Sequence, residues 1–311
     1  MSHIRMIMVK GFNQEPVDEY TANLTISANT NNYDIRAAVV AAGWDGSSVL
    51  HANLIINSGV WVGSVSTSTY AIDTNSSGSF PTDSTIEITN NGTVIGRGGD
   101  GGDGSSAWAY SNNTDGGTTT NDGNVGGDAL YCRDNTNITI ELTNNGTLYG
   151  GGGGGSGGGY CTWASGGYGF ACAGSGGGAG AGGGSGGSLG TRTETASPIG
   201  TWQHRYNAAS GGASSYHAAG SAGSLCDYVQ NYENTGKGST WVSKARAGYA
   251  GAGGAPGNNG TKSTIKAYDW DGANTWANTD NGEAGTRGYS IKGTTNVTIL
   301  VGGTQTPGGF P

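Results

Sequence analysis

Charged side chains are scarce in this chain, at 12% of 311 residues, where an average domain has roughly 25%. Proline is scarce too, with 6 residues, and glycine shows no strict Gly-X-Y period, so a collagen helix is excluded. The sequence has no run of Lys or Arg, and its net charge is −8, which argues against nucleic-acid binding. No apolar run approaches the ~20 residues of a membrane span, so we expect no membrane insertion.

Export signals and close cysteine pairs are also missing. The N-terminal MSHIRMIMVKGFNQEP has a short apolar patch that Arg5 and Lys10 interrupt, which is not a secretory signal, so we expect synthesis in a cytoplasm. No Cys-x2-Cys pair is present to bind zinc. Reduced thiols are favoured, and if a disulfide exists, Cys161–Cys172 is the pairing that closes a local loop. The four cysteines are Cys132, Cys161, Cys172 and Cys226.

What the chain does have is glycine, in 64 positions, together with 8 Trp and 15 Tyr. Disordered chains are usually charged and poor in aromatic residues, so this composition predicts a folded but unusual protein. Near the N-terminus, Ile35, Val39 and Val40 have helical spacing and Gly43 is a stop signal, which predicts one short helix. The segment IRMIMVKGF is interpreted as a first strand.

A short hydrophobic motif recurs. IEITNNGTVIG at 86–96 returns as IELTNNGTLYG at 140–150, and a weaker copy at 55–63 aligns with 88–96. These copies are offset by 33 and 54 residues, and a further relative covers 288–303. Each has two short strand patterns around an Asn-Gly or Ser-Gly turn signal. We interpret them as β-rungs that stack like a solenoid.

Glycine-rich runs follow the rungs and alternate with polar, aromatic segments. Flexible linkers are one interpretation, but the segments between the runs are too short to be domains. The alternative is that the runs pack on one another as polyglycine-II helices, because glycine alone allows backbones to approach closely enough to pair. The rungs then anchor the bundle and set its register, and the loops gather at its ends. The runs are 96–104, 150–159, 174–190 and 248–260.

The resulting expectation is an all-β or irregular fold with solenoid-like β-rungs, a layered polyglycine-II bundle with connecting loops, and one short helix. Residues 1–84 form an N-terminal β domain for attachment, and residues 85–311 form the glycine-rich domain. GRGGDGG, NNGTLYGGGGGG, GYAGAGGAPGN and GEAGTRGYSIKGTTNVTI together resemble the receptor-recognising adhesin of the long tail fibre in T-even-like phages. The resemblance covers about 85–311, and residues 1–84 do not look like that family's attachment domain.

The resemblance implies a non-enzymatic virion protein at the tail tip, assembled in the host cytoplasm. Its partners are a bacterial outer-membrane protein or surface glycan, and other phage tail proteins through residues 1–84. Aromatic residues in the variable loops are the candidate receptor contacts, since Tyr and Trp give large contact areas at low entropic cost. Capping of the bundle by the same rings is the alternative. The candidates are Trp108, Tyr110, Tyr160, Trp163, Tyr168, Phe170, Trp202, His204, Tyr206, Tyr228, Tyr232, Trp241, Tyr268, Trp270 and Trp276.

Other chemistries fit poorly, so no catalytic residue, metal ligand or cofactor is predicted. The GxGxxG matches lack a P-loop Lys and a βαβ context. Asp100 and Asp103 do not have the spacing of calcium-binding repeats. Asp269 and Asp271 are two residues apart in a loop, which is weak support for a glycosidase. A purely structural virion cap is the main alternative function. Ice binding is less favoured, because long aromatic loops interrupt any regular period.

Overall fold

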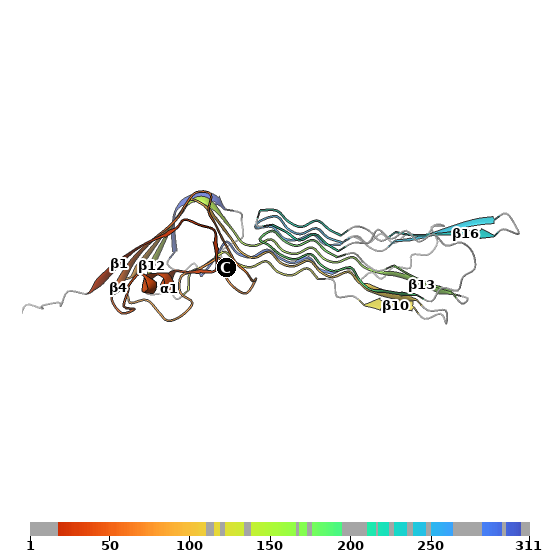
Figure 1. The fold of residues 1–311 in the computed structure, drawn as a ribbon, viewed down its shortest axis with the longest axis horizontal. Helices are drawn as coiled ribbons and strands as arrows, with labels where there is room; N and C mark the ends of the chain where they lie inside the picture. The colour runs from red at the N-terminus through yellow and green to blue at the C-terminus, as the bar shows by residue number, and fades with distance from the viewer. Residues whose placement is uncertain are drawn as a thin grey trace, which may run out of the picture.

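The computed structural model describes residues 18–109, 115–118, 122–133, 138–165, 168–172, 176–194, 210–215, 217–223, 227–234, 239–246, 250–263, 282–293 and 297–305. The molecule is elongated (Figure 1). A β-sheet body with β1 (Glu19–Ile26) and α1 (Ile35–Ala41) lies at one end, which we call the sheet end. Parallel segments run from it to β13 (Cys161–Ser165) and β16 (Asp227–Asn234) at the other, the hairpin end.

The predicted rungs form one parallel sheet. Its strand order is β1-β4-β7-β12-β8-β5-β2, and β19 pairs with β12. The long β12 spans both halves of the sheet, pairing with β7 through its first half and with β8 through its second. The further strands are β2 (Thr30–Asn31), β4 (Val49–Ile56), β5 (Trp61–Gly63), β7 (Thr85–Asn90), β8 (Thr93–Ile95), β12 (Thr139–Tyr149) and β19 (Val297–Gln305).

Rung stacking is confirmed, with one correction to the register. The 54-residue offset holds, because Thr85 pairs with Thr139 and Thr93 with Thr147. The 33-residue offset is wrong in both halves: His51 pairs with Thr85, and Trp61 with Thr93. The corner between β4 and β5 is two residues longer than the corner between β7 and β8, and a gapless sequence alignment cannot represent that difference.

Glycine at the rung corners serves close stacking of the chain. A Cβ on Gly146 would lie 2.0 Å from the carbonyl oxygen of Gly92, and one on Gly92 would lie 2.3 Å from that of Val60. The Asn-Gly signal therefore marks a corner at which successive rungs touch. It does not mark a hairpin, since β7 and β8 each pair with β12.

A second sheet supplies the other wall of the apolar core. Its order is β18-β11-β6-β3, and all its pairs are parallel. Side chains from both sheets and from α1 form one buried cluster that includes Leu54, Ile88, Leu142 and Leu130. The strands are β3 (Tyr33–Asp34), β6 (Ile72–Asp73), β11 (Leu130–Tyr131) and β18 (Ile291–Lys292).

The predicted helix is confirmed as α1. Asp34 caps it by accepting a 2.7 Å hydrogen bond from the amide of Ala37, and Gly43 follows with φ 111°. Ile35 and Val39 are buried one turn apart, whereas Val40 is 45% exposed. The next helical position turns away from the core. The first strand expected in IRMIMVKGF lies outside the described residues.

Beyond the sheets, glycine-rich segments lie side by side along the molecule (Figure 1). Their backbone hydrogen bonds recur every three residues: Gly99 donates to Gly152, Gly102 to Gly155, and Ser105 to Gly158. We call these the glycine segments: 96–105, 122–129, 150–159, 176–181, 182–190, 210–215, 217–223, 250–256, 257–263 and 282–290.

Two glycine segments are interior. Segment 150–159 exchanges backbone hydrogen bonds with six others, which are 96–105, 122–129, 176–181, 250–256, 257–263 and 282–290. Segment 176–181 also bonds to six, which are 96–105, 150–159, 182–190, 210–215, 217–223 and 250–256. The interior of this region is therefore backbone surrounded by backbone. The predicted domain boundary at residue 84 stays a prediction; the first sheet takes strands from both sides of it.

Candidate functional site

Short antiparallel strand pairs occupy the hairpin end. Two of them are isolated hairpins, β13–β14 and β16–β17, and the third pair belongs to the sheet β10-β9-β15. Two of the strands directly continue glycine segments, because β9 follows segment 96–105 and β13 follows segment 150–159. The strands not yet given are β9 (Ser106–Ala109), β10 (Asp115–Thr118), β14 (Tyr168–Cys172), β15 (Arg192–Glu194) and β17 (Ser239–Arg246).

The strand registers pair several of the predicted contact residues along the backbone. Trp163 is the partner of Phe170 in β13–β14, and Tyr232 is the partner of Trp241 in β16–β17. Three more candidates lie in strands of the hairpin end: Trp108 in β9, Tyr168 in β14 and Tyr228 in β16. The other candidates lie outside the described residues; they are Tyr110, Trp202, His204, Tyr206, Tyr268, Trp270 and Trp276.

Tyr160 is the candidate whose side-chain environment is described. It is partly buried and packs against the buried Ala107. A Cβ added to Gly117 would lie 2.4 Å from its ring, so the ring lies close against the β9–β10 pair. This position fits the capping alternative for Tyr160 better than direct exposure to a partner.

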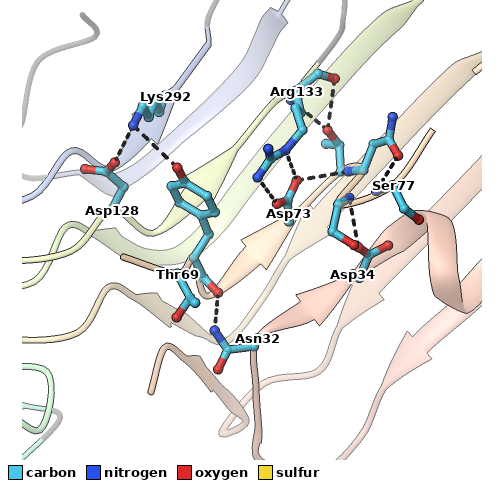
Figure 2. Close-up of polar contacts among 12 residues, drawn as sticks. Asn32, Asp34, Thr69, Asp73, Ser77, Asp128, Arg133 and Lys292 are labelled. Atoms are coloured by element: carbon cyan, nitrogen blue, oxygen red, sulfur yellow. Dashed lines mark hydrogen bonds and ion pairs between the residues drawn. The ribbon is translucent and has the colours of Figure 1, made fainter. Parts of the chain in front are cut away.

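Sequence reasoning missed a polar and aromatic cluster at the sheet end, where β11 and β18 continue glycine segments 122–129 and 282–290 (Figure 2). The rings of Tyr70 and Tyr131 are 4.6 Å apart between centroids. The guanidinium of Arg133 lies 4.5 Å from the Tyr131 centroid, and the Lys292 ammonium lies 5.5 Å from that of Tyr70. No short sequence motif predicts this cluster, because Tyr70 and Lys292 are 222 residues apart.

Each cation in the cluster has a carboxylate partner. Arg133 Nη2 lies 2.7 Å from Asp73 Oδ2, and Lys292 Nζ lies 3.5 Å from Asp128 Oδ2 (Figure 2). The hydrogen bonds that the Arg133 guanidinium donates to the carboxylate of Asp73 raise the pKa of Arg133. Burial lowers the pKa of Lys292, but Tyr70 and Asp128 outweigh burial and raise it overall. Both charges are therefore compensated, and the pair of Lys292 with Asp128 connects β18 to glycine segment 122–129.

The thiol of Cys132 is chemically unreactive in the folded protein. Cys132 is a free, buried thiol, and burial raises its pKa to about 12, with a further contribution from the charge of Asp73. It stays protonated and unreactive at neutral pH. Cys161 and Cys172 are register partners across β13–β14, the position of the pairing expected if a disulfide exists.

Metal sites and membrane spans have no counterpart in the described ranges. There, no group of three or more His, Cys, Asp or Glu side chains has an arrangement that could hold a metal ion. None of the helices described has the length and apolar character needed to cross a bilayer.

These features define a class of protein. An elongated scaffold, rooted in a stacked β-sheet, holds strand pairs with an aromatic-rich sequence at its far end (Figure 1). Comparison with known families identifies it: residues 21–310 match phage tail fibre adhesin Gp38, and the chain belongs to this family. It is a phage tail fibre adhesin, a non-enzymatic receptor-binding protein of the virion. The match begins at residue 21, so it extends further towards the N-terminus than the resemblance over about 85–311.

A solved structure is also similar to this chain. The crystal structure of the gp37–gp38 adhesin tip complex of the bacteriophage S16 long tail fibre aligns with a TM-score of 0.46 and 17% sequence identity. The alignment covers 92% of this chain and 80% of that chain. A search of curated proteins finds no significant match.

Proposed function

We propose that the glycine segments are polyglycine-II helices, and that their bundle holds aromatic strand pairs against a bacterial surface receptor. The supporting observation is the three-residue period of hydrogen bonds between neighbouring segments, as from Gly99, Gly102 and Ser105. Polyproline-II geometry has three residues per turn and no internal hydrogen bonds, so every backbone group needs an external partner. Six neighbours around segment 150–159 provide such partners on all sides.

The requirement for glycine follows from the same packing. A Cβ on Gly154 would lie 1.9 Å from the carbonyl oxygen of Asp100, and one on Gly153 would lie 1.9 Å from that of Gly285. Both distances are far below any van der Waals contact, and the clashing atoms are backbone. The two interior segments therefore coincide with the richest glycine sequence, GGGGGGSGGG at 150–159 and GGGAGA at 176–181.

A scaffold of this kind leaves recognition to the strands that it carries. Its glycine segments have few side chains, whereas the hairpin end combines Tyr and Trp with Ser, Gly and Asn, a composition typical of binding loops. We assign receptor contact to the aromatic candidates of the hairpin end other than Tyr160, whose ring packs against Ala107. The receptor is an outer-membrane protein or a surface glycan, since both suit aromatic and amide side chains.

Attachment to the virion is assigned to the opposite end. In the bacteriophage S16 complex, gp38 is joined to gp37. By analogy, residues 1–84 dock this chain on a fibre protein through the sheet end. That end contains β1, α1 and β4, and it lies far from the hairpins along the long axis (Figure 1). One end then faces the fibre and the other faces the host.

The experiment is binding of purified, fluorescently labelled protein to a panel of bacterial strains, with phage adsorption measured in competition. Saturable binding to the strains that the parent phage infects, with blocked adsorption, supports receptor recognition. Absence of binding to every susceptible strain overturns it and favours a structural virion cap.

A further inference from the structure

Side-chain oxygens replace a missing neighbour along one edge of the glycine segments. Asp100 Oδ1 accepts a 2.7 Å hydrogen bond from the amide of Ser185, while the carbonyl of Ser185 accepts one from Gly101 at 2.9 Å. Both backbone groups of Ser185 are therefore tied to segment 96–105. We call this arrangement a clamp.

The clamp repeats every three residues. Asp103 Oδ1 accepts from the amide of Ser188 at 2.7 Å, and Gly104 donates to the Ser188 carbonyl at 2.8 Å. One turn later Ser106 Oγ accepts from the amide of Thr191 at 3.0 Å, and Ala107 donates back at 2.9 Å. In each clamp the acceptor residue and its partner are 85 residues apart.

This separation continues without a slip into the strands of the hairpin end. In the parallel pair of β9 with β15, Ala107 is the partner of Arg192 and Trp108 is the partner of Thr193, at the same separation. The clamps and the strand pair thus form one ladder from Asp100 to Ala109. Its far end is the strand that contains Trp108.

Pairing between glycine backbones cannot set such a register by itself. Because the pattern repeats every three residues, sliding one segment by a full turn, ~9 Å, restores the same kinds of backbone hydrogen bond. Register is weakly specified wherever side chains do not distinguish the alternatives. Side chains at the end of the ladder make one alignment different from the rest, because Thr191 Oγ1 donates a 2.8 Å hydrogen bond to Ser106 Oγ that a full-turn slip breaks. The carboxylates of Asp100 and Asp103 then hold segment 182–190 in that alignment.

A second ladder joins segments 122–129 and 282–290 and runs towards the sheet end. Asp122 and Asp128 accept 2.7 and 2.8 Å hydrogen bonds from the amides of Glu283 and Tyr289, in both cases from 161 residues away. The same separation continues into β11–β18, where Leu130 pairs with Ile291. This ladder leads to the sheet end and provides an internal control.

We propose that Asp100 and Asp103 are positioning residues of the receptor-binding end, which hold segment 182–190 against segment 96–105 and so hold β15 in place beside β9, the strand that contains Trp108. The proposal rests on the proposed function of the hairpin end, and it adds the residues that hold this end in place. The two carboxylates need not touch the receptor, because they act through the amides of Ser185 and Ser188.

The test compares Asp100→Ala/Asp103→Ala with Asp100→Asn/Asp103→Asn, whose amide oxygen can still accept the hydrogen bonds. Asp122→Ala is the matched control, because it removes a clamp of the other ladder. Hydrogen exchange is measured in peptides from residues 182–194, together with saturation binding to a susceptible strain. We expect the alanine pair to speed exchange throughout 182–194 and to weaken binding at least about tenfold. The asparagine pair restores both, and Asp122→Ala changes neither.

Two results overturn the proposal: exchange in 191–194 that stays at the wild-type rate in the alanine pair, or a binding loss in Asp122→Ala as large as that of the pair. Exchange needs no receptor, so it decides whether the clamps position the strands even if the wild-type protein binds no cells. Failure of wild-type binding contradicts the proposed function and leaves the exchange result standing.

Discussion

The side-chain amide of Asn90 donates a 2.7 Å hydrogen bond to the side-chain oxygen of Asn144, its equivalent in the next rung. Both residues are buried, at 1% and 0% exposure. Asn90 also donates to the carbonyl of Thr147 and accepts from the amide of Gly92. The first Asn of each TNNGT motif is therefore an internal ladder residue, and Asn90 also holds the corner of its own rung through the amide of Gly92.

The two asparagines differ in the number of buried groups that they hydrogen-bond. Asn90→Ala leaves several buried groups without partners, whereas the Nδ2 of Asn144 already has no partner among the described residues. A buried polar group left unsatisfied costs about 1–3 kcal/mol. We predict that Asn90→Ala lowers the free energy of unfolding by about 3 kcal/mol and Asn144→Ala by less, measured by chemical denaturation. Equal losses contradict the assigned hydrogen bonds.

Val125 occupies a position of the second ladder at which the side chain cannot accept a hydrogen bond. It lies between Asp122 and Asp128 at the same three-residue spacing, and Gly126 donates to the Thr286 carbonyl as the pattern requires. Valine offers no acceptor for the Thr286 amide, and its side chain is 55% exposed. Val125→Asp should complete the ladder and stabilise the protein by about 1 kcal/mol.

The measurement for Val125 is the melting temperature, with hydrogen exchange at residue 286. Val125→Leu is the control, because it changes the side chain without supplying an acceptor. An aspartate variant that melts with the leucine variant, and exchanges equally fast at residue 286, refutes the clamp geometry at this position.

Gly154 tests the glycine requirement of the interior. Gly154→Ala places a methyl group 1.9 Å from a backbone oxygen, so neighbouring segments must separate. Overpacking in a tight core typically costs about 1–3 kcal/mol, and we expect the upper end or more. Ser188→Ala is the control, since it changes an exposed residue that already has a Cβ. Thermal unfolding followed by circular dichroism decides the matter, and equal melting temperatures for the two variants argue against close packing.

The buried thiol of Cys132 makes the free energy of unfolding fall at high pH. Its pKa is raised from 9.0 to about 12 by burial, so the folded state holds the proton more tightly than the unfolded state. The stabilisation is fully present below pH 9 and is lost as the pH rises from 9 towards 12. Cys132→Ala should flatten this part of the stability profile, measured by denaturation at several pH values. Parallel profiles for the two proteins rule out the titration of Cys132.

The sequence predicted those parts of the fold that repeat or carry local signals. The IEITNNGT and IELTNNGT motifs predicted parallel rungs 54 residues apart, and Ile35 and Val39 with Gly43 predicted α1. It could not predict the second sheet. A strand as short as Leu130–Tyr131 shows no periodic pattern in the sequence. It forms because a glycine segment places Leu130 beside its partners Ile72 and Ile291.

The candidate site was less predictable, for a related reason. Composition indicated the aromatic segments, and the structure adds that Trp163 and Phe170, like Tyr232 and Trp241, are register partners. The clamps at Asp100 and Asp103 were interpreted only as poor calcium ligands, because their partners lie 85 residues away. Contacts between segments that are far apart in the chain produce no pattern within a short window of sequence.

The most direct test of the account is saturation binding of Tyr232→Ser/Trp241→Ser to a susceptible strain, beside Tyr289→Ser. Tyr232 and Trp241 lie in the β16–β17 hairpin, whereas Tyr289 is a 42% exposed residue on segment 282–290. The account predicts that the hairpin variant melts like the wild-type protein and loses binding and competition with phage adsorption, while Tyr289→Ser keeps both. Unchanged binding by the hairpin variant, or an equal loss in Tyr289→Ser, would contradict recognition through the hairpin end.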